Sequence, residues 1–182
     1  MLRLAGCLLF ASSLFCCAAE PEKPADKASA QAVAETPKVI APAEDGSVTL
    51  HARDVTIHGK TVRYEPQPNK NTIGFWTKVD DWVSWEFEVQ NVGAYHVDIL
   101  QGCGKGSGGA KVDFIVTDAA GTEQKLEVEV QDTGHFQNFV SRAIGKVKLP
   151  RAGKYTFSVK PKTKPGAAVM DLRQVVLRYD EK

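Results

Sequence analysis

The chain has 182 residues, of which 43% are hydrophobic, and this length and composition are typical of one globular domain. Its 23 basic and 22 acidic residues leave a formal net charge of +1. The chain therefore lacks the strong basic bias of a general nucleic-acid-binding protein, and we expect no nucleic-acid partner. After the N-terminal segment, no apolar run is long enough to span a bilayer.

Residues 1–19 have the pattern of a secretory signal peptide. Arg3 precedes the apolar run LAGCLLFASSLFCCAA, which ends in small residues, and cleavage after Ala19 fits the small-residue rule. The segment LFCC also resembles a bacterial lipoprotein box, so a membrane lipid anchor at Cys17 is the alternative. We expect a secreted or periplasmic protein, or an outer-membrane-anchored lipoprotein if Cys17 is lipidated.

Residues 20–45 are predicted to be a disordered linker. They are rich in Ala, Pro, Glu and Lys and contain no aromatic residue, so they cannot bury enough apolar surface to become ordered. Three of the four cysteines lie in residues 1–19, which leaves Cys103 alone in the rest of the chain. A single cysteine cannot form an internal disulfide, and we expect Cys103 to be a buried packing residue rather than a reactive thiol.

Residues 46–182 show the period-two alternation of half-buried strands. In WVSWEFEV (82–89), apolar side chains fall on one face and polar ones on the other. Turn signals separate such segments, and no segment has a helical stripe. The pattern predicts an all-β, antiparallel sandwich. The other alternating segments are 95–99, 111–116, 125–130 and 155–159.

The glycine-rich stretch LQGCGKGSGG (100–109) contains a literal G-x-G-x-x-G pattern. A dinucleotide site needs a helix directly after these glycines, whereas here the strand-like AKVDFIV follows. We therefore predict a strand-to-strand connection. Its glycines would let backbone amides, and the side chain of Lys105, approach a ligand closely.

Catalytic motifs are missing from the sequence. There is no G-x-S-x-G elbow and no H-E-x-x-H zinc pattern. Asp80 and Asp81 are adjacent and would point apart on an extended chain. We expect no enzymatic activity.

Aromatic residues gather in two turn-rich segments, NTIGFWTKVDDW (71–82) and DTGHFQNF (132–139). Exposed rings in polar loops are platforms on which the CH faces of a sugar can stack, and neighbouring side chains such as Asn138 can bind hydroxyls. The alternative is that these rings close the end of the sandwich core.

The same two segments, with the strands that follow them, resemble conserved blocks of carbohydrate-binding modules of family 6 and family 35, the galactose-binding-like type. AVMDLRQVVL (168–177) resembles the last strand of those modules, and the resemblance extends over residues 47–178. It implies a galactose-binding-like jelly roll that binds sugar without catalysis, through loops at one end. A narrower resemblance is to the accessory domain of secreted bacterial sulfatases and α-L-fucosidases.

The resemblance also implies a site and a ligand class. The sugar-stacking positions would be Phe75 or Trp76 from the first segment, and Phe136 or Phe139 from the second. Lys105 and Asn138 would add hydrogen bonds. The ligand would be a polysaccharide or glycoconjugate, sulfated or fucosylated, with Lys105 and Arg142 as sulfate contacts and a separate sulfatase or glycosidase as a partner.

Many modules of this type hold a structural calcium between an acidic residue of the first strand and an aspartate of the last. Asp171 is the matching aspartate, but Arg53 stands where the acidic residue is usual and could pair with Asp171 instead. We therefore expect no cofactor, with Asp171 as the ligand if calcium binds. A different hypothesis is a structural or protein-interaction sandwich of the cell envelope that has no sugar site.

Overall fold

The computed structural model describes residues 38–181, which fold almost entirely into β-strands. The single helical element in this range is a short 3-10 helix, η1 (Ala52–Asp54). The strands are β1 (Val39–Ile40), β2 (Val48–His51), β3 (Thr56–His58), β4 (Arg63–Glu65), β5 (Thr72–Gly74), β6 (Trp82–Val89), β7 (Gly93–Cys103), β8 (Lys111–Asp118), β9 (Glu123–Glu129), β10 (His135–Leu149), β11 (Gly153–Pro161) and β12 (Asp171–Tyr179).

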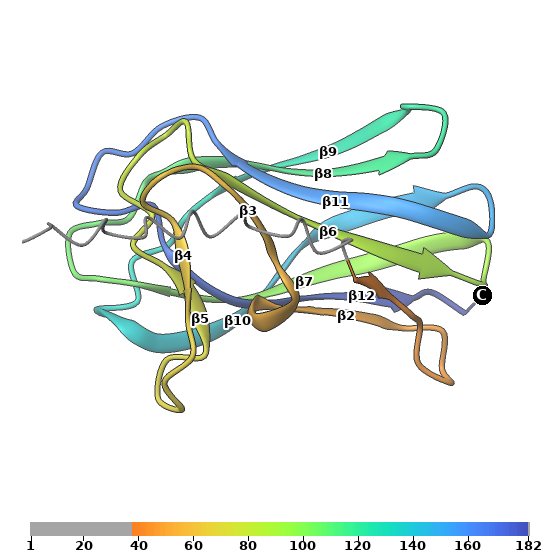
Figure 1. Cartoon of the computed structure of the whole chain (residues 1–182), viewed down its shortest axis with the longest axis horizontal. Helices are drawn as coiled ribbons and strands as arrows, with labels where there is room; N and C mark the ends of the chain where they lie inside the picture. Colours follow the sequence, from red (N-terminus) through yellow and green to blue (C-terminus); the bar gives the residue numbers. More distant parts are fainter. Residues whose placement is uncertain (1–37, 182) are drawn as a thin grey trace, which may run out of the picture. The chain divides into compact units, whose positions relative to one another are not determined.

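The strands form two layers, as Figure 1 shows. One sheet has the order β1-β6-β11-β8-β9, with β3 also paired to β6; we call it the β6 sheet. The other has the order β10-β7-β12-β5-β4, with β2 also paired to β12; we call it the β7 sheet. All pairings are antiparallel except that of β1 with β6. The predicted all-β sandwich is confirmed.

The core lies between the two inner faces, because period-two strands direct every second side chain inward. Val83, Trp85, Phe87 and Val89 of β6 are all buried, as the alternation predicted. Across the core, alternating residues of β7 are buried in the same way. The free cysteine, Cys103, also lies in this core, which confirms its predicted packing role.

Strand β1 lies inside the segment that the sequence assigned to a disordered linker. Val39 and Ile40 pair in parallel with Glu86 and Phe87 at the edge of the β6 sheet. The side chain of Lys38 lies 2.9 Å from the carboxylate of Asp54. The boundary at residue 45 is therefore wrong for residues 39–40, because their pairing with β6 makes them part of the sheet.

Residues 1–37 lie outside the described range. The predicted signal peptide (1–19), the lipid anchor at Cys17 and the linker up to residue 37 therefore remain predictions. Within the part of the chain that the structure describes, no helix is long and apolar enough to cross a membrane.

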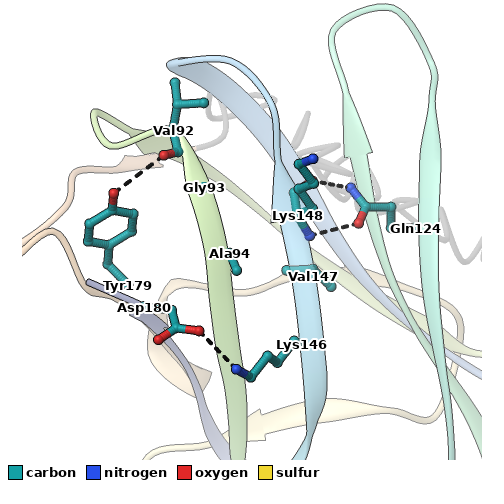
Figure 2. Close-up of a pocket in the computed structure, with 9 residues that line it drawn as sticks. All are labelled: Val92, Gly93, Ala94, Gln124, Lys146, Val147, Lys148, Tyr179 and Asp180. Carbon is teal, nitrogen blue, oxygen red and sulfur yellow. Dashed lines mark hydrogen bonds and ion pairs between the residues drawn. The ribbon is translucent and has the colours of Figure 1, made fainter. Parts of the chain in front are cut away.

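Near one end of the sandwich, the side chain of Gln124 joins the two sheets. Gln124 of β9 donates a hydrogen bond to the backbone oxygen of Lys148 in β10 and accepts one from its backbone N–H at 2.8 Å (Figure 2). A hollow of about 550 Å³ lies beside this bridge. Its polar groups bond one another, since Lys146 lies 2.8 Å from Asp180 and the Tyr179 hydroxyl contacts the Val92 oxygen.

Candidate functional site

The candidate site is a cavity of about 270 Å³ at the other end of the sandwich. It lies where β4 and β5 end and where β10 and β12 begin, so four strands that are far apart in the sequence contribute to it. The cavity has two aromatic rings, two carboxyl groups and one ammonium group among its lining residues. These residues are Glu65, Lys70, Phe75, Thr77, Phe136, Gln137, Ala167, Ala168 and Asp171.

Phe75 forms one aromatic wall, directly after β5. Its side chain is 46% exposed, and its backbone has a left-handed φ of 53°, which is uncommon for a residue other than glycine. The guanidinium carbon of Arg63 lies 3.5 Å from the ring centroid, which covers one ring face. Strained backbone is concentrated at binding sites, where the surrounding structure maintains it. The Nζ atom of Lys70 also lies 5.9 Å from the ring centroid, and Phe75 is one of the residues that line the cavity.

Phe136 is the second aromatic wall, and an irregularity in β10 places it there. His135 pairs with Cys103, but the next pair is Val140 with Gln101, so β10 contains three more residues than β7 over this interval. The extra residues bulge out of the ladder. A bulge re-aims side chains, and here it turns Phe136 toward the cavity.

The glycine-rich stretch explains how this bulge fits against β7. A Cβ atom placed on Gly104 would lie 2.5 Å from the ring of Phe136, and one on Gly102 would lie 1.9 Å from the Phe136 backbone oxygen. Any larger residue at either position would push the bulge away. These glycines therefore permit close approach of two backbones, and they hold an aromatic wall of the cavity rather than a phosphate.

Lys105 and Asn138 lie outside the cavity lining. Lys105 is exposed, and its backbone N–H donates to the oxygen of Gly134 at 3.3 Å. The side-chain amide of Asn138 donates to the Thr133 oxygen at 2.6 Å, so it braces the loop that precedes the bulge. The structure thus does not bring these two predicted hydrogen-bonding residues together with the aromatic walls.

Trp76 and Phe139, the alternative stacking residues, have other roles. Trp76 is 0% exposed, and its indole N–H donates to the backbone oxygen of Asp81 at 2.7 Å. Its prediction as a stacking residue is wrong, because the left-handed turn at Phe75 directs the next side chain into the core. Phe139 does not line the cavity; its ring lies 3.7 Å from the guanidinium carbon of Arg173. Phe75 and Phe136 are therefore the two rings that face a common space.

The floor of the cavity contains two buried carboxyl groups. Glu65 is 7% exposed and Asp171 is 4% exposed. A Cβ atom on Gly74 would lie 2.4 Å from Oε2 of Glu65 and 3.2 Å from Oδ1 of Asp171, so both acids surround one point of the backbone. Burial and, after it, the charge of Glu65 raise the pKa of Asp171 to about 7, against the opposing effects of Lys70 and Gln137.

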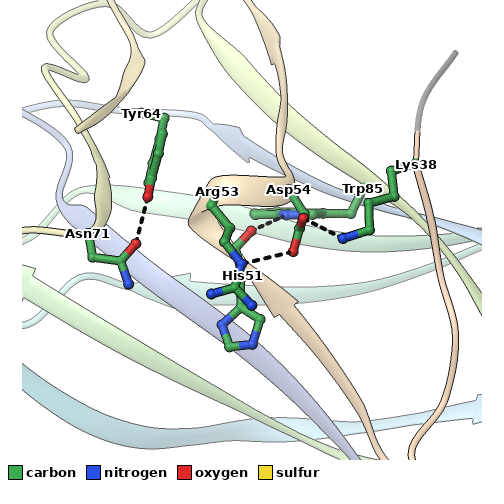
Figure 3. Close-up of polar contacts among 7 residues, drawn as sticks. All are labelled: Lys38, His51, Arg53, Asp54, Tyr64, Asn71 and Trp85. Carbon is green, nitrogen blue, oxygen red and sulfur yellow. Dashed lines mark hydrogen bonds and ion pairs between the residues drawn. The ribbon is translucent and has the colours of Figure 1, made fainter. Parts of the chain in front are cut away.

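Lys70 supplies the single ammonium group of the lining. Its Nζ atom lies 2.6 Å from Oε1 of Glu65. The turn that carries Lys70 is fastened to β12, because Arg173 donates to the backbone oxygens of Lys70 and Asn69, each at 2.9 Å. The Tyr64 hydroxyl also donates to the side chain of Asn71 at 2.8 Å (Figure 3). Lys70 is therefore positioned by the fold.

Arg53 does not pair with Asp171. Its Nε atom lies 3.7 Å from the carboxylate of Asp54, which also binds Lys38 (Figure 3). The predicted Arg53–Asp171 ion pair is therefore wrong, since Asp171 lies in the cavity floor beside Glu65. Within residues 38–181, no three His, Cys, Asp or Glu side chains gather into a candidate metal-binding group. Calcium binding at Asp171 stays a prediction.

Several lining residues escaped the sequence analysis: Glu65, Lys70, Thr77, Gln137, Ala167 and Ala168. They belong to three separate segments. Thr77, Gln137 and Ala168 lie within the segments that resemble carbohydrate-binding modules but were not themselves predicted as site residues, and Glu65, Lys70 and Ala167 lie outside those segments. The segment EPQPNKN (65–71) contained a weak signal, because its prolines and asparagines predict a tight turn just before the aromatic pair.

No protein-family model matches the chain, and no curated protein matches it. Solved structures do match the chain. The C-terminal CBM6 of LamC, a marine laminarinase from Zobellia galactanivorans, aligns with a TM-score of 0.58 and 18% identity over 73% of this chain and 99% of that one. A family 35 carbohydrate-binding module from Clostridium thermocellum aligns with a TM-score of 0.58 and 13% identity over 72% of this chain and 96% of that one. The chain has the fold of CBM6 and CBM35 modules.

A third structure of this fold was determined with a ligand. The module CBM6cm-2 of Cellvibrio mixtus lichenase 5A, in complex with cellotriose, aligns with a TM-score of 0.53 and 17% identity over 73% of this chain and 97% of that one. The CBM6/CBM35 fold therefore accounts for nearly the whole length of each compared module, and the predicted galactose-binding-like sandwich agrees with it.

Proposed function

We propose that the chain is a non-catalytic glycan-binding module that binds a sugar ring in the cavity between Phe75 and Phe136. The observation that carries this proposal is the pairing of two aromatic side chains around a floor of buried hydrogen-bonding groups. The likeness to binding modules supports it, and one of those modules was solved with cellotriose.

The chemistry of the cavity suits a sugar. The CH faces of a pyranose ring are apolar and pack on aromatic rings, and the half-exposed ring of Phe75 in the cavity lining offers such a surface. Sugar hydroxyls can donate hydrogen bonds to the carboxyl groups of Glu65 and Asp171, and hydrogen bonds to charged acceptors are the stronger kind. The cavity volume of about 270 Å³ lies near the lower end for small-ligand sites, which suits a terminal sugar unit.

Of the two ligand classes that the sequence suggested, a fucosylated glycan fits better than a sulfated one. Ala167 and Ala168 add apolar lining, which could face the methyl group of a 6-deoxy sugar. Arg142, a predicted sulfate contact, donates instead to the side chain of Gln101 at 2.7 Å and to the Glu129 oxygen at 3.1 Å. Lys105 lies outside the cavity.

A catalytic role has less support. Glycoside hydrolysis needs two carboxyl groups on opposite sides of one bond. Here Glu65 and Asp171 approach the same point beside Gly74, and Glu65 is paired with Lys70. We further propose that binding occurs outside the cytoplasm, after signal-peptide cleavage or lipidation at Cys17, and that a separate glycosidase or sulfatase acts on the bound glycan.

A glycan array that includes neutral, fucosylated and sulfated oligosaccharides tests the proposal. Phe75→Ala and Phe136→Ala should each weaken binding by about tenfold or more, because each removes a stacking surface of order 1–2 kcal/mol. Val92→Ala, an exposed apolar residue at the opposite end, is the control and should bind as the unaltered protein does. Lys105→Ala should also leave binding unchanged. Failure to bind any glycan would refute the proposal and favour a structural sandwich of the envelope.

A further inference from the structure

The charges in the proposed sugar site are unevenly balanced. Lys70 lies 2.6 Å from Glu65 and neutralises that carboxylate. Asp171 has no such cation: among residues 38–181 no lysine or arginine forms an ion pair with it, and the side chain of Gln137 is its hydrogen-bonding partner. The ionised cavity therefore contains two negative charges and one positive charge, all held in place by buried or anchored segments.

The arginines near the cavity cannot reverse this balance. The guanidinium group of Arg63 lies 3.5 Å from the ring centroid of Phe75 and does not belong to the lining. Arg173 is engaged by the backbone oxygens of Lys70 and Asn69, and it also stacks on Phe139. Arginine binds sulfate and carboxylate groups through two-pronged contacts, but neither of these guanidinium groups belongs to the cavity lining.

We propose that Glu65 and Asp171 make the site selective by charge, so that it takes an uncharged sugar and rejects sugars that carry a sulfate ester or a carboxylate. This inference rests on the proposed function and names the ligand class of the same cavity. An uncharged sugar donates its hydroxyl protons to the two acids. An anionic group in that position would face a buried carboxylate, while the one ammonium group of the lining, that of Lys70, is already paired with Glu65. Such repulsion is a common source of specificity.

The groups that face Asp171 determine how this selectivity depends on pH. They are Glu65 of β4, Lys70 of the following turn, Gln137 of β10 and the thiol of Cys103 in β7. Burial raises the pKa of the Cys103 thiol to about 11, so it stays neutral. Asp171 itself has a pKa raised to about 7. The discrimination should therefore be strongest at a pH of about 8, where Asp171 is ionised, and weaker at a pH of about 5.5.

Matched monosaccharides test the inference by titration calorimetry or NMR at a pH of about 8. The probes are the methyl glycosides of fucose, galactose and glucose, each beside its sulfate ester, and the last two beside their uronates. We expect every anionic probe to bind at least about tenfold more weakly than its neutral parent. The reason is that repulsion between like charges a few ångströms apart in a partly dry site lowers the affinity by more than about tenfold. Equal or tighter binding of the anionic probes would overturn the inference alone. Absence of binding by these sugars and by every glycan of the array would overturn the proposed function as well.

Isosteric variants then locate the effect. Asp171→Asn should reduce the neutral-to-anionic affinity ratio to within about threefold. The matched control is Glu123→Gln, which removes an exposed carboxylate of β9 outside the cavity and should leave the ratio unchanged. Glu65→Gln provides a second variant, which should also lower the ratio, because it leaves Lys70 unpaired. Circular dichroism confirms that each variant is folded; an unchanged ratio in both cavity variants would refute the assignment.

Discussion

Asp81 and Asp171 are both almost fully buried, with 3% and 4% of their surface exposed, but their surroundings differ. The carboxylate of Asp81 accepts four hydrogen bonds, from the backbone N–H groups of Lys60, Thr61 and Val62 and from the Thr61 hydroxyl. Burial alone would raise its pKa, yet these donors hold the pKa well below the ordinary value. Asp171 faces another carboxylate, and its pKa rises to about 7.

Similar surface exposure thus accompanies opposite pKa shifts: at Asp81 the hydrogen-bond donors together outweigh burial, whereas at Asp171 deeper burial and the charge of Glu65 prevail. Asp81 has its acceptor capacity filled by the chain and anchors the turn at residues 60–62 to the segment after Trp76. Asp171 keeps acceptor capacity that faces a cavity. The first arrangement is structural, and the second is what a binding site for hydroxyl groups requires.

The largest expected effect is at Asp81. Asp81→Ala leaves one hydroxyl and three backbone donors without their acceptor, and we expect the free energy of unfolding to fall by about 3–5 kcal/mol. Asp80→Ala is the matched control, since Asp80 is the exposed neighbour and should change stability by less than about 0.5 kcal/mol. Urea denaturation measures both, and a similar loss in the two variants would break the contrast.

The pH dependence of stability should distinguish the two aspartates. Because the folded-state pKa of Asp171 is raised from 3.8 to about 7, the folded protein holds a proton there that the unfolded chain has released. That contribution to stability is present at low pH and is lost as the pH rises through 7. Relative to Asp171→Asn, the unaltered protein should therefore lose roughly 1 kcal/mol of stability per pH unit between about pH 4 and pH 7.

The measurement is thermal or urea unfolding of both proteins across this pH range. For Asp81, whose folded-state pKa is lowered, the stabilising contribution is present above the ordinary value of 3.8 and is lost as the pH falls toward the folded-state pKa. Relative to Asp81→Asn, the unaltered protein should thus gain stability as the pH rises in the acid range, which is the opposite of the trend expected for Asp171. Parallel pH profiles for the two asparagine variants would contradict the comparison.

A smaller effect is expected where the glycine-rich stretch supports the cavity. Gly104→Ala places a methyl group 2.5 Å from the Phe136 ring, so we expect a loss of about 1–3 kcal/mol in stability and weaker sugar binding. Gly106→Ala is the control: its φ of 76° makes the change unfavourable by about 1 kcal/mol, but no atom lies within 4 Å of the added methyl group. Stability should fall in both variants, whereas calorimetry should detect weaker binding in Gly104→Ala alone.

The sequence alone predicted the sandwich because strand alternation is a local property. Trp85 and Phe87 lie on the same face of their strand and both are buried, as the alternation predicted, and the aromatic-rich segments at 71–82 and 132–139 each supply one ring to the cavity lining. It could not separate Phe75 from Trp76, since a single left-handed residue decides which ring points outward. It also placed the start of the ordered chain too late, because β1 is defined by its pairing with β6.

The cavity itself was decided by the tertiary structure. Glu65, Phe136 and Asp171 come from three strands, and they meet only because β10 bulges against the glycines of β7 and β12 begins beside β5. Register shifts and close backbone approach depend on which strands become neighbours, and no local pattern encodes that choice. Composition and periodicity thus determined the sandwich and its candidate rings, whereas the packing of distant segments determined which rings and which carboxyl groups share one space.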